Sequence, residues 1–190
     1  MKDSLQRKIA QRIELFNRMA HVEHLLSAAE IIEKKLREDK KILIFGNGGS
    51  STQASHFAAE LVNKFYFPRP ALAAVALTTD IANITSIAND FDFREIFARQ
   101  VMALGRPGDV AIGISTSGTS PNVLDGLNAA AQSGLTTIAL CGSNSTALAE
   151  LNVDHILSVP SEDTPAVQEM HLFMLHFLAE TVEEKIFAAK

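Results

Sequence analysis

The chain has 190 residues, 47% of them hydrophobic and 21% charged, which is enough to bury a core as one globular domain. A net charge of −5 excludes the basic surface that nucleic acid requires, and no apolar run reaches the roughly 20 residues that span a bilayer. The single cysteine, Cys141, allows no internal disulfide, and residues 1–6 carry charges where a signal peptide is apolar. We therefore expect a cytoplasmic protein that binds neither nucleic acid nor a membrane.

The first part of the chain predicts two helices. Leu5, Ile9, Ile13 and Phe16 recur at helical spacing, and a second apolar series ends at Leu36. We interpret residues 1–39 as a helical extension of a single domain that spans residues 1–190.

Beyond residue 40, short apolar strands alternate with helical segments. Strands are predicted at residues 41–45, 73–77, 109–114, 136–140 and 155–159. Helices are predicted at residues 52–63, 81–89, 94–104 and 121–133, and a long one begins at Pro165 with Thr164 as its cap. Strands separated by helices form a parallel sheet with helices on both faces. The predicted fold class is α/β, a three-layer sandwich around a five-stranded parallel sheet, with the N-terminal helices added.

The segment after the first strand is the most informative part of the chain. Asn47, Gly48 and Gly49 follow four apolar strand residues and precede a helix. Such a turn aims unpaired backbone N–H groups and the positive end of the helix at an anion, and its glycines let a ligand approach the backbone closely. The turn lacks both the G-x-G-x-x-G spacing of dinucleotide sites and the lysine of a P-loop.

A second loop repeats this arrangement after the third strand. It offers the hydroxyls of Ser115, Thr116, Ser117 and Ser120, followed by the N–H groups of the helix that opens with Pro121. One such cluster alone is more often a simple turn than a ligand site. Two of them at the carboxyl ends of parallel strands, however, favour the binding of a phosphorylated small molecule.

Two further pairs of polar residues are candidates for chemistry. His56 and Glu60 stand four residues apart on the helix after the first loop, so they share one face. That spacing suits two ligands of one metal ion, or a general base beside its orienting partner, and it is also common in surface pairs. Asn89 and Asp90 fall in the predicted break between two helices, where they could bond sugar hydroxyls or form an Asx turn.

The C-terminal helix is apolar on nearly all sides over residues 170–178. A helix of this kind must be buried all round, which in a short chain indicates subunits that pack together. Gln168, Glu169, His171 and His176 interrupt it, and burying such side chains is costly unless they are paired or functional.

These residues resemble the sugar isomerase (SIS) family. The resemblance runs in register from the N-terminal helices to about Ile186, and it is carried by Gly46-Asn47-Gly48-Gly49-Ser50, Asn89-Asp90-Phe91, Gly113-Ile114-Ser115-Thr116-Ser117-Gly118 and Gln168-Glu169-Met170-His171. Each string alone is weak, whereas the combination is specific. Within the family, the chain looks like the branch that isomerises sedoheptulose 7-phosphate to D-glycero-D-manno-heptose 7-phosphate, the first step of ADP-heptose and lipopolysaccharide core heptose synthesis.

The resemblance implies a flavodoxin-like fold, a homotetramer with active sites at subunit interfaces, and one Zn²⁺ per subunit. It implies that the substrate is contacted by Asn47, Gly48, Gly49, Glu60, Asn89, Asp90 and Gln168, and its phosphate by Ser115, Thr116, Ser117 and Ser120. The implied metal ligands are His56, Glu60, Gln168 and His176, and the implied acid/base pair is Glu60 and His176.

Aldose–ketose isomerisation needs a base at carbon, an acid at oxygen and stabilisation of the developing oxyanion. We assign Glu60 to the carbon and His176 to the oxygens. Gln168 and His176 lie eight residues apart, a helical rise of about 12 Å, whereas metal–ligand bonds are about 2 Å long. Both can reach one ion only by leaning together, so we favour a site completed by a neighbouring subunit.

The alternative interpretation is the non-catalytic branch of the family that binds the replication initiator DnaA. That branch lacks a glutamate at the position of Glu60, whereas this chain retains it together with the three other implied metal ligands. The chain departs from its relatives after Leu140, where residues 141–145 replace a longer Gly-Gly loop. The sequence therefore does not predict the shape of residues 141–145 at the rim of the site, nor which sugar that rim admits.

Overall fold

The computed structural model describes residues 2–19 and 22–188; residues 1, 20, 21, 189 and 190 of the predicted domain lie outside the described part. The two expected N-terminal helices are α1 (Lys2–Arg18) and α2 (Val22–Arg37). The strands are β1 (Ile42–Gly46), β2 (Ala74–Ala76), β3 (Val110–Ser115), β4 (Thr136–Cys141) and β5 (His155–Ser158). The helices between and after them are α3 (Gly49–Val62), α4 (Ile81–Asp90), the 3₁₀ turn η1 (Phe93–Glu95), α5 (Ala98–Leu104), α6 (Pro121–Gln132), α7 (Thr146–Glu150) and α8 (Thr164–Phe187).

The five strands form one sheet in the order β2-β1-β3-β4-β5, and every pair of neighbours is parallel. The central strands β1 and β3 are buried along their whole length, as expected of strands covered on both faces. The predicted α/β fold with a five-stranded parallel sheet is thereby confirmed. The carboxyl ends of β1 and β3 lie next to each other, because Gly46 is in register with Ile114.

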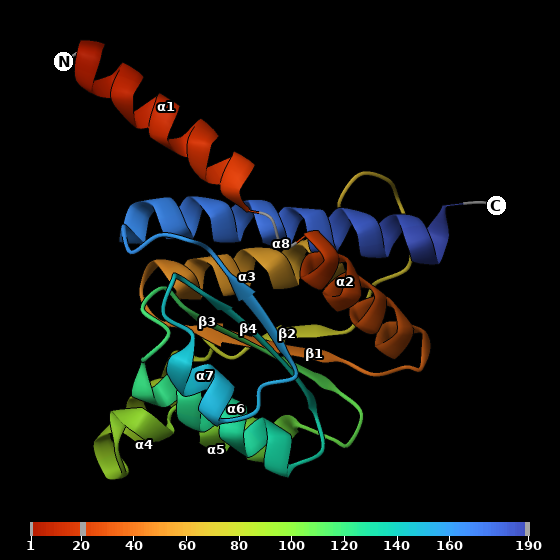
Figure 1. The fold of residues 1–190 in the computed structure, drawn as a ribbon. Helices are drawn as coiled ribbons and strands as arrows, with labels where there is room; N and C mark the ends of the chain where they lie inside the picture. The colour runs from red at the N-terminus through yellow and green to blue at the C-terminus, as the bar shows by residue number, and fades with distance from the viewer. Residues whose placement is uncertain (1, 20–21, 189–190) are drawn as a thin grey trace.

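Alternate residues of the strands point to opposite faces of the sheet and pack into two separate hydrophobic cores. The sheet and the helices on its two faces make three layers. On one face, Ile42 and Ile44 pack beneath α2, α3 and α8; on the other, Leu43 and Phe45 pack against α5, α6 and α7. Figure 1 shows α8 lying along α3 on the first face, with α4 to α7 gathered on the opposite side of the sheet. Helix α1 points away from this body, and only its last turns reach it.

The structure corrects several element boundaries. Helix α3 begins at Gly49, inside the expected loop, and Asn89 and Asp90 are the last residues of α4 rather than a break between helices. The helix predicted at residues 94–104 is a 3₁₀ turn followed by α5, because Asp92 caps the turn by accepting the backbone N–H of Arg94. Helix α8 starts one residue early, with Asp163 at the N-cap position and no side-chain capping bond.

The apolar C-terminal helix is covered mainly by its own chain. Residues Met170, Met174, Leu175 and Leu178 are buried in the core shared with α2, α3 and the sheet, whereas Phe173 remains 44% exposed. The composition of α8 is therefore explained largely by packing within the chain. Within the described ranges, every helix is too short or too polar to serve as a membrane span.

Candidate active site

The first loop turns sharply from β1 into α3. Gly48 has a φ of 53°, in the left-handed region that favours glycine, and the backbone N–H of Ser50 bonds the carbonyl of Asn47 at 2.9 Å. The backbone N–H of Ser51 bonds the carbonyl of Gly48 at 3.0 Å, so the N–H groups of Ser50 and Ser51 in the first turn of α3 are both bonded within the loop. The loop lies at the carboxyl edge of the sheet as predicted, and its binding of an anion stays a prediction.

Two amide side chains connect the first loop to α6, the helix that follows the second loop. The Nδ2 atoms of Asn47 and Asn122 each donate to the Oδ1 of the other, both at 2.8 Å. Asn122 is 2% exposed and is the second residue of α6, so the pair holds the two helix N-termini beside each other. Asn122 was not among the predicted site residues, because its partner Asn47 is distant in the chain.

The second loop gathers its hydroxyl groups around Ser115. The Ser115 Oγ lies 2.9 Å from the Ser120 Oγ and 3.4 Å from the Ser117 Oγ, and the N–H of Thr119 donates to the Ser117 Oγ at 3.2 Å. Ser120 sits at the N-cap position of α6, yet its hydroxyl bonds Ser115 instead of capping the helix. Several hydroxyl groups are thus gathered at the start of α6, and hydroxyls can donate hydrogen bonds to a phosphate.

The short segment after β4 packs against the second loop. The N–H of Gly142 bonds the carbonyl of Thr116 at 3.1 Å, and a Cβ on Gly118, whose φ is 69°, would lie 1.9 Å from the carbonyl oxygen of Asn144. A pocket of about 290 Å³ opens between these segments and the start of α8, lined by Thr116, Ser117, Thr119, Ser143, Asn144 and Glu162 among others. Residues 141–145, the rim whose shape the sequence did not predict, therefore form one wall of the pocket at the serine-rich loop.

Gln168 lies against the first loop. A Cβ on Gly49 would come within 2.6 Å of the Gln168 Nε2, so a larger residue here would displace this amide. The backbone carbonyl of Gln168 accepts a bond from the Gln53 Nε2 at 2.7 Å, which fastens the start of α8 to α3. The Gln53 Oε1 is buried and has no protein partner among the described residues.

His56, Glu60 and His176 converge farther along α3. The Nε2 atoms of His56 and His176 are 2.8 Å apart, and the His56 Nε2 lies 3.5 Å from the Glu60 Oε1. Phe65 packs beside them, with its ring centroid 5.8 Å from that of His176. His56 follows Gly49 in α3 by a helical rise of about 10 Å, so the cluster lies about that far along the helix from the first loop.

The cluster has the donor chemistry of a zinc site. Two imidazole nitrogens and a carboxylate oxygen face one another, which is a set that Zn²⁺ binds well. The two Nε2 atoms are hydrogen-bonded to each other, so one of them carries a proton that a metal would have to displace. Across the described residues, no three or more His, Cys, Asp or Glu side chains are spaced as the ligands of a formed metal centre.

Asn89 and Asp90 are the predicted site residues that the structure places elsewhere. The Asn89 Nδ2 donates to the Asp90 Oδ1 at 2.7 Å, and both residues are exposed at the end of α4. Asp90 lines a separate pocket between α4 and α5, together with Arg99. Among the described residues, no hydrogen bond or ion pair joins this pair to either loop or to the histidines.

Two buried groups lie behind the site. The Nε2–H of His171 donates to the carbonyl of Cys141 at 3.1 Å, and its Nδ1 has no protein partner among the described residues. Burial lowers the pKa of His171 to about 4, against the smaller opposing effect of this bond. Burial also raises the pKa of the Cys141 thiol to about 11. Both groups are therefore neutral near pH 7 and act as packing and hydrogen-bonding groups.

Two polar loops at the carboxyl edge of a parallel sheet are typical of α/β domains that bind phosphorylated small molecules, and the fold and loops place this chain in that class of architecture. In agreement, residues 7–142 match the family model of the SIS domain.

Comparison with known proteins identifies the family within this class. The chain is 55% identical over 159 residues to the phosphoheptose isomerase of Thermodesulfovibrio yellowstonii, covering 84% of this chain and 79% of that protein. It is 44% identical to that of Trichlorobacter lovleyi, covering 98% and 96%. The solved phosphoheptose isomerase of Neisseria gonorrhoeae superposes with a TM-score of 0.90 at 38% identity, covering 96% of this chain and 98% of the other. The chain therefore belongs to the SIS domain family and, within it, to the phosphoheptose isomerases.

Proposed function

We propose that this protein is an aldose–ketose isomerase that converts sedoheptulose 7-phosphate to D-glycero-D-manno-heptose 7-phosphate. The observation that carries this proposal is the convergence of His56 and Glu60, on the helix α3 that follows the first loop, with His176 on α8. Its relatives from T. yellowstonii and T. lovleyi bear the name phosphoheptose isomerase, which fits this substrate. The product belongs at the entry to ADP-heptose synthesis for lipopolysaccharide.

The residues divide the reaction between two ends of the site. The loop from Ser115 to Ser120 binds the phosphate, and this binding energy is gained far from the reacting carbons. Glu60 removes the proton from the carbon next to the carbonyl while His176 donates a proton to the carbonyl oxygen, and an enediol forms. His176 then takes the proton from the other oxygen of the enediol as Glu60 returns its proton to the former carbonyl carbon, which completes the isomerisation.

We assign one Zn²⁺ per subunit to His56, Glu60, Gln168 and His176. When bound, the ion supplies polarisation of the two substrate oxygens. Gln168 packs on Gly49, apart from the contact between the histidines, so a partner subunit's residue or a movement of this amide would complete the ligand set. We also propose that Asn89 and Asp90 contact the substrate of a neighbouring subunit, because in this chain they lie at a different pocket from the loops and the histidines.

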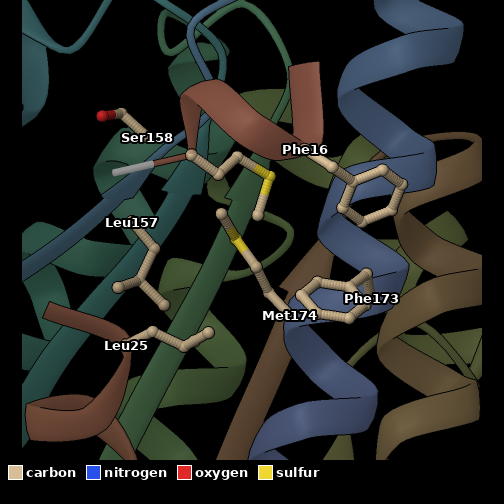
Figure 2. Close-up of a pocket in the computed structure, with 7 residues that line it drawn as sticks. Phe16, Leu25, Leu157, Ser158, Phe173 and Met174 are labelled. Atoms are coloured by element: carbon tan, nitrogen blue, oxygen red, sulfur yellow. The ribbon is translucent and has the colours of Figure 1, made fainter. Parts of the chain in front are cut away.

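The protein is proposed to be a cytoplasmic homotetramer. Helix α1 presents Leu5, Ile9 and Ile13 to solvent, 61%, 51% and 57% exposed, which is an apolar stripe that a second copy can cover. The stripe continues through Phe16, whose ring meets Phe173 edge to face at 5.1 Å between centroids. Figure 2 shows these rings at the mouth of an apolar pocket of about 210 Å³, which also includes Leu25, Leu157 and Met174.

The deciding experiment incubates the purified protein with sedoheptulose 7-phosphate, with and without a chelator, and follows the formation of aldose phosphate. Turnover is expected in untreated protein, and its loss with chelator and recovery with Zn²⁺ would support the metal assignment. No aldose phosphate under any of these conditions would overturn the proposed reaction. The non-catalytic DnaA-binding alternative is not favoured, because a docking surface has no need for the cluster at Glu60. Light scattering of the same sample measures the oligomeric state.

A further inference from the structure

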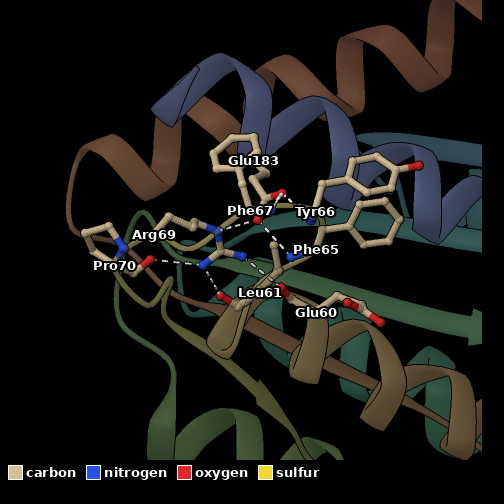
Figure 3. Close-up of polar contacts among 8 residues, drawn as sticks. All are labelled: Glu60, Leu61, Phe65, Tyr66, Phe67, Arg69, Pro70 and Glu183. Carbon is tan, nitrogen blue, oxygen red and sulfur yellow. Dashed lines mark hydrogen bonds and ion pairs between the residues drawn. The ribbon is translucent and has the colours of Figure 1, made fainter. Parts of the chain in front are cut away.

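A buried ion pair lies directly behind the candidate acid/base cluster. The side chains of Arg69 and Glu183 are 1% and 0% exposed, and the Arg69 Nε donates to the Glu183 Oε1 at 2.8 Å. Figure 3 shows the pair between the end of α3 and the helix α8, where each charged group is surrounded by further hydrogen bonds. Burying two charges is costly unless their remaining hydrogen-bonding capacity is satisfied, so this pair needs an explanation beyond packing.

The guanidinium of Arg69 caps the C-terminal end of α3. Arg69 donates to the carbonyl of Glu60 at 2.8 Å and to that of Leu61 at 2.7 Å, while the N–H of Asn63 bonds the carbonyl of Ala59. Carbonyls in the last turn of a helix have no partner within the helix, and a cation there also interacts favourably with the helix dipole. The backbone of the residue assigned as catalytic base is therefore held directly by Arg69.

The carboxylate organises the segment that follows α3. Glu183 accepts the backbone N–H groups of Phe65 at 2.8 Å and of Tyr66 at 2.6 Å, in addition to the guanidinium. Burial raises the pKa of Glu183, but these N–H groups and Arg69 outweigh it, so the net pKa is lowered and the group is ionised. The bond to Phe65 fixes the residue whose ring packs beside that of His176.

The two arms of this network end at the two groups assigned to proton transfer. One arm runs from Arg69 to the backbone of Glu60, and the other runs from Glu183 through Phe65 to the ring of His176. Resting on the isomerase function proposed above, we propose that Arg69 and Glu183 are positioning residues that set the relative placement of the catalytic base and acid.

Arg69→Lys tests the first arm. Lysine keeps the positive charge beside Glu183 but lacks the planar fork that bonds two carbonyls at once. The kcat of this variant is expected to fall about 100-fold, because a displacement of about 1 Å of a catalytic group has this effect. Its KM for sedoheptulose 7-phosphate is expected to stay within about threefold of the unmodified protein, because the phosphate loop lies at the other end of the site.

Arg37→Lys is the matched control. Arg37 also pairs with a carboxylate, that of Glu33, and also donates to a carbonyl near a helix end, that of Lys185, but it is largely exposed and lies outside the site. Its kcat is expected to be unchanged. If Arg69→Lys and Arg37→Lys have the same kcat, or if Arg69→Lys changes KM and leaves kcat intact, the positioning role is overturned.

Phe65→Leu tests the second arm and does not disturb the buried charges, so it decides the question if Arg69→Lys does not fold. Its kcat is expected to fall about tenfold with KM unchanged, and an unchanged kcat would overturn the proposal.

If the unmodified protein turns over no sugar phosphate, the proposed function fails, and the positioning role is then tested by amide hydrogen exchange. Faster exchange at residues 57–66 in Arg69→Lys but not in Arg37→Lys would support it, and equal exchange would overturn it.

Discussion

The Nε2 atoms of His56 and His176 lie 2.8 Å apart, although the two residues are separated by 120 positions in the chain. They meet because α3 and α8 pack side by side on one face of the sheet. The chemistry of the site therefore depends on how these two helices are held together. Gln53 fastens them at the loop end, and the Arg69–Glu183 pair does so at the other.

Glu60→Gln is expected to reduce kcat by about 1000-fold and to leave the KM for the sugar phosphate nearly unchanged. The amide retains the size of the side chain but cannot accept the proton from carbon. Steady-state kinetics with sedoheptulose 7-phosphate provides the measurement, and zinc content is determined in parallel so that loss of the metal is recognised. Glu184→Gln, which alters an exposed carboxylate on α8, is the control. Turnover near that of the control would remove Glu60 from the mechanism.

His56→Ala is expected to lose most of the bound zinc. The unmodified protein, dialysed against Zn²⁺ and then against buffer, should retain about one ion per subunit, since imidazole and carboxylate donors already face one another at this position. Atomic absorption on both proteins measures the difference. Equal zinc content in the two proteins would place the metal elsewhere or exclude specific binding.

Gly118→Ala is expected to raise the KM for the sugar phosphate at least about tenfold and to destabilise the protein by about 1–3 kcal/mol. An added Cβ would lie 1.9 Å from the Asn144 carbonyl oxygen, so the second loop would have to move away from the segment that follows β4. Gly134→Ala is the matched control, because Gly134 also has a positive φ, 76°, but its nearest neighbour would be 3.5 Å away. If both variants have the same KM, the second loop does not bind the phosphate.

Sequence alone located the parts of the site that depend on local spacing. The two loops were predicted because each directly follows an apolar strand, and His56 and Glu60 because four residues separate them on one helix. Asn122, Arg69 and Glu183 were missed because each depends on a hydrogen-bond partner that lies 75 to 118 residues away in the chain.

The interpretation of α8 shows the same limit. The apolar composition of α8 indicated that the helix is buried, but the sequence did not indicate that α2, α3 and the sheet provide most of this burial. An exposed apolar face lies on α1 at Leu5, Ile9 and Ile13, where the sequence predicts a helix that could extend a subunit interface. A helical pattern identifies the face that needs covering, whereas the covering element is determined by tertiary contacts.

His171→Gln is expected to make the free energy of unfolding less dependent on pH in the acidic range. Burial lowers the pKa of His171 to about 4 from an ordinary value of 6.5, so the unfolded chain takes up a proton at a higher pH than the folded one. The stability that the neutral ring contributes is complete above pH 6.5 and is lost as the pH falls towards 4, by about 3 kcal/mol. Glutamine can still donate to the Cys141 carbonyl but does not titrate.

Urea denaturation at pH 7.0, 5.5 and 4.5, at one protein concentration, measures this effect. Relative to the unmodified protein, His171→Gln should be less stable at neutral pH, because its packing is altered, and should then lose less stability on acidification. His155→Gln, which removes a partly exposed imidazole from β5, controls for the loss of one histidine. Parallel pH profiles for His171→Gln and the unmodified protein would mean that the buried ring is not what makes the fold sensitive to acid, since the variant lacks it.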